Sequence, residues 1–234
     1  MSFYIGLSFL SNNGGNKKLR QGLLSAEGRR ILSCLEGRPL KENEIVRDEK
    51  GRPFIPGNPG DFSISHSGVM AAVSLVKGKA LRTGCDIQIA RSGTSIREIV
   101  RLFFTAPERD YIFSSLKKQT EENRFFKIWA LKECFLKLRG LSVFDMASVP
   151  SFISGNDSGQ EPFTFSETVL SPLSFYLYEL AGKSDKRYFL AVAIEGIMQV
   201  EPVIHWFSQS FLPSRSIAEI KATLSPDRTV SPKM

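Results

Sequence analysis

The segment from Glu121 to Gly140, EENRFFKIWALKECFLKLRG, decides the fold that the sequence predicts. It contains no proline, its interior is rich in strong helix formers, and Gly140 follows a basic end, which predicts a helix that stops at a glycine. Its apolar residues recur at three- and four-residue steps and cover a wide arc. Most of this helix should therefore be buried.

Charged residues lie at the edge of this apolar helix. Lys132, Glu133 and Lys137 are among them, and Glu133 and Lys137 stand one turn apart on the same side. A Glu-to-Lys pair on a solvated edge contributes roughly 0.3–0.5 kcal/mol and has no further role. The alternative, a functional role for the pair, depends on residues elsewhere in the chain.

Length, composition and charge narrow the class of protein. At 234 residues and 42% hydrophobic content, the chain can bury a core as one large domain or as two halves. No apolar run approaches the ~20 residues of a membrane span, and the start MSFYIGLSF lacks the features of a signal peptide, so we expect a cytoplasmic protein without membrane association. The net charge of +7 indicates an acidic partner: nucleic acid, anionic lipid, a phosphorylated ligand or an acidic protein.

Cysteine and histidine exclude some kinds of site. Cys34, Cys85 and Cys134 lie far apart in apolar or helical segments, which is typical of buried thiols and not of disulfides. The chain has only two histidines, His66 and His205. A multi-histidine metal site is excluded on that count.

The order of elements predicts two halves and a tail. Residues 1–90 begin with a strand and a basic helix, pass through a loop rich in glycine and proline, and end in antiparallel strands. Residues 91–212 follow roughly the same order around the central helix, and residues 213–234 form a polar tail. Whether the basic helix binds phosphate or only faces solvent stays open.

Local signals predict the remaining elements. Helices are expected over residues 94–104 and 105–116, the second with a capping Thr105, a proline in its first turn and Glu108 three residues after the threonine. Strands are expected over residues 3–10, 44–46, 62–68, 70–76, 81–89, 147–153, 163–165, 174–180, 188–194 and 203–207.

Asp86 lies in the strand predicted over residues 81–89, with apolar residues on both sides. Alternation along a strand places Asp86 and Gln88 on the same face. A carboxylate in such a strand needs a partner, because an unpaired buried charge costs several kcal/mol. Arg82 or Lys132 is one possible partner. A hard cation such as Mg²⁺, held by Asp86 together with Glu133, is the other.

Four segments occur in a fixed order along the chain. They are Gly51–Phe54 (GRPF), Phe62–Gly68 (FSISHSG), Gly84–Gln88 (GCDIQ) and Trp129–Lys137 (WALKECFLK). Each alone is a weak signal, but together they resemble the 4′-phosphopantetheinyl transferases of the Sfp type, in the holo-acyl-carrier-protein synthase superfamily. The similarity covers about residues 51–140, with looser agreement in element order on either side.

The resemblance implies both a fold and a reaction. The fold is α+β, with two similar α/β halves related by a pseudo-twofold axis and the active site in the cleft between them. The reaction moves the phosphopantetheine arm of coenzyme A to a serine of an acyl or peptidyl carrier protein, with Mg²⁺ or Mn²⁺, and releases adenosine 3′,5′-bisphosphate. It would serve fatty-acid, polyketide or peptide synthesis, and an acidic carrier protein would suit the net charge of +7.

The resemblance also implies roles for single residues. Asp86 and Glu133 match metal ligands, Lys137 matches a lysine near the leaving phosphate, and Glu108 matches a carboxylate at the cleft. The residues that resemble the group around the coenzyme A phosphates are Arg52, Ser65, His66 and Lys132. The carrier serine must lose a proton, and Glu133, Glu108 or a metal-bound water remain open as the base.

Gln88 departs from the family pattern, which often has a glutamate at this position. A glutamine can still ligate Mg²⁺ through its carbonyl oxygen, but it brings no charge. It therefore motivates one alternative function, a degenerate family member that binds coenzyme A or carrier protein without turnover. A basic nucleic-acid-binding protein is a second alternative, which lacks a recognised motif in this sequence. We expect a monomer that does not bind nucleic acid.

Overall fold

The computed structural model describes residues 1–10, 16–91, 93, 95–154, 163–165, 172–182, 186–197, 201–207 and 218–220. Its helices are α1 (Lys17–Glu36), α2 (Ile96–Phe103), α3 (Ala106–Phe113) and α4 (Lys118–Arg139), with 3₁₀ turns over Glu42–Glu44 and Val143–Ser148. Its strands are β1 (Ser2–Phe9), β2 (Val46–Arg47), β3 (Pro53–Phe54), β4 (Asp61–Ser67), β5 (Met70–Lys77), β6 (Arg82–Ile89), β7 (Phe152–Ser154), β8 (Phe163–Phe165), β9 (Leu173–Ala181), β10 (Arg187–Glu195), β11 (Val203–Trp206) and β12 (Ala218–Ile220).

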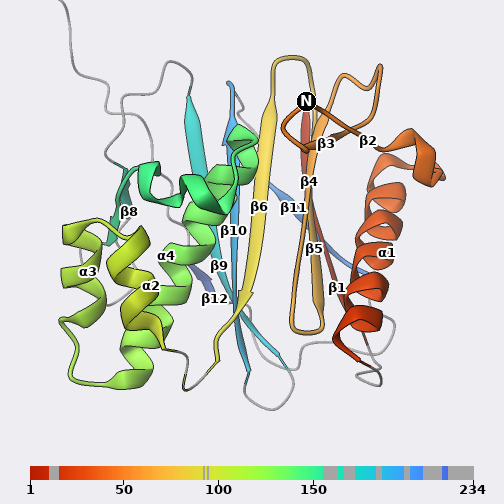
Figure 1. The fold of residues 1–234 in the computed structure, drawn as a ribbon. Coiled ribbons are helices and arrows are strands. Elements are labelled where there is room, and N and C mark those ends of the chain that lie inside the picture. Colours follow the sequence, from red (N-terminus) through yellow and green to blue (C-terminus); the bar gives the residue numbers. More distant parts are fainter. Residues whose placement is uncertain are drawn as a thin grey trace, which may run out of the picture.

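Two four-stranded sheets form the middle of the molecule. Their strand orders are β11-β1-β5-β4 and β12-β9-β10-β6, and the neighbours are antiparallel except for the parallel pair β1 and β11. Figure 1 shows α1 on one side of the sheets and α2, α3 and α4 on the other. This arrangement confirms the α+β fold class, while the pseudo-twofold axis stays a prediction.

Three apolar cores separate these layers. One lies between α1 and the first sheet, one between the two sheets, and one between α4 and the second sheet. Strand β10 contributes to both the core between the sheets and the core beneath α4, because its alternate residues point to opposite faces. Leu190 and Val192 belong to the first of these cores, and Phe189 and Ala191 belong to the second.

The predicted halves and the observed sheets divide the chain differently. Strand β6, which falls within residues 1–90, pairs with β10 in the second sheet. Strand β11, which falls within residues 91–212, pairs with β1 in the first sheet. Within the tail expected over residues 213–234, β12 pairs with β9, and the rest of that tail lies outside the described residues.

Side chains join the two sheets where their edge strands β4 and β6 meet. The hydroxyl of Ser65 accepts a hydrogen bond from the Ile87 amide at 3.2 Å, and that of Ser67 accepts one from the Ile89 amide at 3.1 Å. The Cys85 thiol donates to the Ser63 carbonyl at 3.2 Å. Alternation in β4 thus presents a row of serines, which we call the serine junction, to the neighbouring strand.

Helix ends follow the predicted signals, and some boundaries differ. Gly140 caps α4 with a φ of 65°, a left-handed conformation that favours glycine. Thr105 and Glu108 form the expected capping box of α3. Residue 44, predicted in a strand, ends a 3₁₀ turn instead, because the Glu44 carboxylate accepts a hydrogen bond from the Lys41 amide at 2.7 Å. In the part of the chain described, no helix is long and apolar enough to cross a membrane.

Gly84 sets how closely α4 packs on β6. An ideal Cβ at this position would lie 2.4 Å from the Cys134 carbonyl oxygen and 2.9 Å from the Leu138 amide nitrogen, both backbone atoms of α4. Backbone atoms of a packed helix cannot move aside as a flexible side chain can. The glycine before Asp86 therefore lets the helix that carries Glu133 and Lys137 lie directly on the strand.

We expect Gly84→Ala to lower the free energy of unfolding by about 1–3 kcal/mol, because the added methyl group overpacks the contact between α4 and β6. Gly22→Ala is the control, since a Cβ at Gly22 in α1 meets no atom within 4 Å. Alanine favours an exposed helical position over glycine by roughly 0.5–1 kcal/mol, so this variant should be more stable. Urea unfolding measures both, and a neutral Gly84→Ala would contradict the close contact.

Candidate active site

Asp86 stands at the centre of a buried polar cluster on three elements. Its side chain is 4% exposed. One carboxylate oxygen accepts hydrogen bonds from Lys137 Nζ of α4 at 2.6 Å and from Ser65 Oγ of β4 at 2.8 Å. The other accepts one from Gln88 Nε2 at 2.7 Å. The structure thus brings together four of the residues that the sequence predicted for the site.

Glu133 joins this cluster through its charge. Burial first, and then the neighbouring charge of Asp86, raise the pKa of Glu133 to about 7, while Lys137 acts in the opposite direction. Burial lowers the pKa of Lys137, but the charge of Asp86, the neighbouring Cys85, the hydrogen bond to Asp86 and the charge of Glu133 together outweigh burial, so the pKa is raised. Glu133 and Lys137, which the sequence predicted to lie one turn apart on α4, are therefore both close to the charge of Asp86 on β6.

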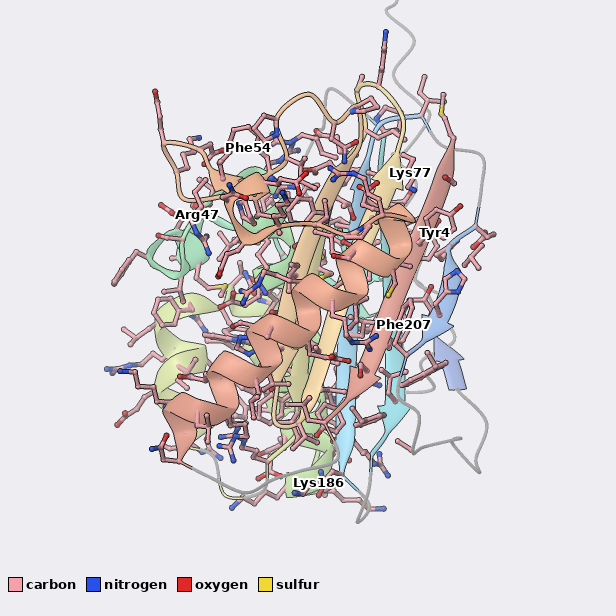
Figure 2. All side chains as sticks on the ribbon, turned by 90° about the vertical axis from the view of Figure 1, so that its right-hand side faces the viewer. Tyr4, Arg47, Phe54, Lys77, Lys186 and Phe207 are labelled. Carbon is pink, nitrogen blue, oxygen red and sulfur yellow. The ribbon has the colours of Figure 1, made fainter. Side chains whose placement is uncertain are left out.

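A pocket of about 360 Å³ opens beside this cluster. It lies between α1, the segment around β2 and β3, strand β4 and the C-terminal end of α4, and Lys137 and His66 belong to its wall. Its basic residues besides His66 are Arg29, Arg47, Lys50, Arg52 and Lys137, and none of the described residues that line it is acidic. Figure 2 shows Arg47 and Phe54 on one side of α1 and Phe207 on the other.

The two predicted residues of β4 have different surroundings. Ser65 is 5% exposed, and Lys137 Nζ donates to its hydroxyl at 2.9 Å, so it supports the charged cluster. His66 is half-buried in the wall of the pocket. Burial, followed by the charge of Lys137, lowers the pKa of His66. Its placement beside the basic residues is consistent with an anion-binding role.

Glu108 and Lys132 lie elsewhere. Both side chains are fully buried, and Lys132 Nζ lies 3.2 Å from Glu108 Oε2. Lys132 also donates to the Val149 carbonyl, and Glu108 accepts hydrogen bonds from the amides of Thr105 and Phe152. The structure therefore gives this pair a role in holding α3 and β7 against α4, and the cleft roles that the family resemblance implied for it stay a prediction.

Arg52 reaches the pocket but has its own partners. Its guanidinium donates to the Lys137 carbonyl, to the Asp61 carboxylate and to the Thr83 carbonyl. Its side chain is only 8% exposed. The predicted phosphate contact of Arg52 would thus compete with three oxygens of the protein itself.

Several residues of the pocket had no predicted role. Arg47 and Lys50 come from a strand end and a loop without a recognised motif, and Arg29 lies on the helix that was predicted only to be basic. The one available signal was the excess of basic residues before Gly51. It could not say which of them converge.

The donor atoms suit a magnesium ion. Asp86 and Glu133 supply carboxylates, and Gln88 supplies an amide whose carbonyl oxygen could ligate, which matches the preference of Mg²⁺ for a few hard oxygen ligands. Burial first, and then the negative charge of Asp86, raise the pKa of Glu133 to about 7, and a bound dication would relieve the repulsion between the two carboxylates. Among the described residues no group of three or more His, Cys, Asp or Glu side chains could hold a metal ion, so a third carboxylate is missing.

Comparisons with known proteins define the class. A family model described as the 4′-phosphopantetheinyl transferase superfamily matches residues 82–193, which include Asp86, Glu133 and Lys137. The 4′-phosphopantetheinyl transferase AcpT of Salmonella typhi is 30% identical over 162 residues, which cover 64% of this chain and 82% of that protein. AcpT of Salmonella typhimurium is 31% identical over the same length, and the 4′-phosphopantetheinyl transferase of Bacillus subtilis is 34% identical over 96 residues, 39% of each chain. The chain belongs to the 4′-phosphopantetheinyl transferase superfamily, as the resemblance of its four segments predicted.

We expect Lys132→Met to lower the free energy of unfolding by about 3–5 kcal/mol, because it leaves the Glu108 carboxylate buried without its counter-ion. Lys118→Met, at an exposed position of the same helix, is the control and should stay within about 0.5 kcal/mol of the parent protein. Urea unfolding of the three proteins at neutral pH makes the comparison. If Lys132→Met had the stability of the parent protein but bound coenzyme A weakly, Lys132 would be a ligand-binding residue of the cleft and not a structural one.

Proposed function

We propose that this protein transfers the 4′-phosphopantetheine arm of coenzyme A to a serine of an acyl or peptidyl carrier protein and releases adenosine 3′,5′-bisphosphate. One observation carries the proposal: the partly buried cluster of Asp86, Glu133 and Lys137 adjoins a basic pocket of about 360 Å³. Membership of the superfamily and the names of its relatives agree with it. We also propose the holo-acyl-carrier-protein synthase type of reaction, in a cytoplasmic monomer.

The pocket supports binding of the nucleotide end of coenzyme A. Its volume is within the range of small-molecule sites. The 3′-phosphate and the pyrophosphate of coenzyme A carry several negative charges, which Arg29, Arg47 and Lys50 can neutralise, with His66 as a further donor. Lys137 lines the pocket and also contacts Asp86, so a ligand there would place its pyrophosphate beside the carboxylate cluster.

The residues around the pyrophosphate of coenzyme A would position this group and neutralise its charge. Asp86, Glu133 and the amide oxygen of Gln88 would hold Mg²⁺, which supplies neutralisation of the pyrophosphate charge when bound. The Lys137 ammonium would stabilise the negative charge that develops on the leaving phosphate. Phosphoryl transfer needs little covalent help from the protein beyond these contributions.

Glu133 is the best candidate for the base. In the absence of Mg²⁺ the pKa of its carboxyl group is raised to about 7, and a carboxylate oxygen that is not bound to the ion would accept the proton. Glu108, the other candidate side chain, is fully buried against Lys132. The serine hydroxyl would pass its proton to Glu133 while the serine oxygen bonds to the phosphorus next to pantetheine. The bridging phosphorus–oxygen bond then breaks, and adenosine 3′,5′-bisphosphate leaves with the electron pair.

The partner would be an acidic carrier protein. A net charge of +7 favours encounter with a negatively charged protein. The same charge permits nucleic-acid binding, but Arg29, Arg47, Lys50, Arg52 and Lys137 line one small pocket beside the carboxylate cluster, which suits a small phosphorylated ligand better than a polynucleotide.

The reaction is tested by incubating purified apo carrier proteins with this protein, coenzyme A and Mg²⁺, and measuring their intact mass. We expect a mass gain of one phosphopantetheine group per carrier, because the site combines a coenzyme A pocket with a phosphoryl-transfer cluster. A chelator should abolish the gain, and so should Glu133→Ala. Coenzyme A binding without a gain on any carrier would favour the degenerate alternative, and the absence of any binding would refute the proposed site.

We expect Gln88→Glu to lower the Mg²⁺ concentration needed for half-maximal activity about tenfold, because a third carboxylate adds charge to the ligand set. Titration of the transfer rate with Mg²⁺ measures this. Gln88→Ala is the companion variant, and it should raise the requirement. If the parent protein had no transfer activity and Gln88→Glu were active, the natural chain would be a family member that binds its ligands without catalysing the transfer.

A further inference from the structure

The Arg52 guanidinium closes a ring of hydrogen bonds between the two sheets. It donates to the carboxylate of Asp61 in β4 and, at 2.8 Å, to the carbonyl of Thr83 in β6. The Thr83 amide in turn donates to the same Asp61 carboxylate at 2.8 Å. A planar guanidinium, with donors in a fixed fork, suits such a ring better than an ammonium group does.

The remaining bond of Arg52 goes to α4. Its NH1 group donates to the carbonyl of Lys137, in the last turn of the helix. Carbonyls at a helix C-terminus carry partial negative charge and lack the full set of amide partners. Arg52 therefore fixes the backbone of the residue whose ammonium lies 2.6 Å from Asp86.

The loop before β3 presents Arg52 in a defined position. One carboxylate oxygen of Asp48 accepts hydrogen bonds from the amides of Lys50 and Arg52, at 3.0 and 2.8 Å. Gly51 adopts a φ of 81° between them, which favours glycine over residues with a side chain. The Gly-Arg-Pro sequence thus forms a turn that points a nearly buried arginine at the end of α4.

We propose that Arg52 and Asp61 are positioning residues, which hold the last turn of α4, and with it the Lys137 ammonium, in register with Asp86. This inference rests on the proposed role of Lys137 in phosphopantetheine transfer. Arg52 acts through Lys137 and Asp61 acts through Arg52. Neither needs to touch coenzyme A.

The substitutions that separate this role from a phosphate contact are Asp61→Asn and Arg52→Lys. Asp61→Asn removes the counter-ion but leaves Arg52 in place. Glu195→Gln is the matched control, because Glu195 of β10 neutralises Arg139 in the same last turn of α4, at 2.5 Å, away from the pocket. Circular dichroism melting first establishes that each full-length variant is folded.

Hydrogen exchange gives a readout that does not depend on activity. In Asp61→Asn, the amides of residues 137–141 should exchange about tenfold faster than in the parent, because Arg52 without its counter-ion holds the Lys137 carbonyl less firmly. Exchange in the middle of α4 and in the Glu195→Gln control should change much less. Equal exchange of residues 137–141 in Asp61→Asn and the parent overturns the proposal.

Kinetics and calorimetry give the second readout. Asp61→Asn should lower kcat about 100-fold, because a displaced Lys137 no longer meets the leaving phosphate, while the affinity for adenosine 3′-monophosphate, which lacks that phosphate, stays within about threefold. Arg52→Lys should show the same changes in kcat and affinity. If Asp61→Asn does not fold, Arg52→Lys is compared with the parent protein in its place. A weaker affinity with normal kcat would instead make Arg52 a phosphate ligand. Transfer absent from the parent protein refutes the proposed function, whereas the exchange result alone decides the positioning role.

Discussion

The contact between Lys137 and Asp86 is the interaction on which the rest of the site depends. It joins α4 to β6, and it is possible only because Gly84 lets the helix lie against the strand. Two charges in a nearly buried setting are costly unless their geometry is good. Ser65 and Gln88 also donate to the aspartate, one to each carboxylate oxygen, so most of the hydrogen-bonding capacity of Asp86 is met within the protein.

Helix α4 contributes a lysine to each of two ion pairs, and the two pairs differ in their access to solvent. Lys132 and Glu108 are enclosed on all sides and hold secondary elements together. Lys137, five residues further on, keeps 30% of its side chain exposed and borders a basic pocket. The residue types are nearly the same in both pairs. Access to solvent and to a phosphorylated ligand distinguishes the one that can take part in a reaction.

Much of this site follows from periodicity. A buried helix with Glu133 and Lys137 one turn apart, and a strand with Asp86 and Gln88 on one face, are readable from spacing alone. Lys132 shows the limit, because neighbouring helical residues differ by about 100° and Lys132 therefore faces another way than Glu133. Glu108 already had a local partner as the third residue of a capping box. Arg29, Arg47 and Lys50 converge only through tertiary packing, which no local pattern encodes.

The serine junction makes the contact between the two sheets depend on side chains and not on the backbone. Within a sheet, backbone groups make the ladder, and most substitutions leave it intact. Between β4 and β6, hydroxyl groups of Ser65 and Ser67 replace backbone acceptors. The spacing between β4 and β6 therefore depends on side chains, so the contact between the two sheets is open to single substitutions in a way that a backbone ladder is not.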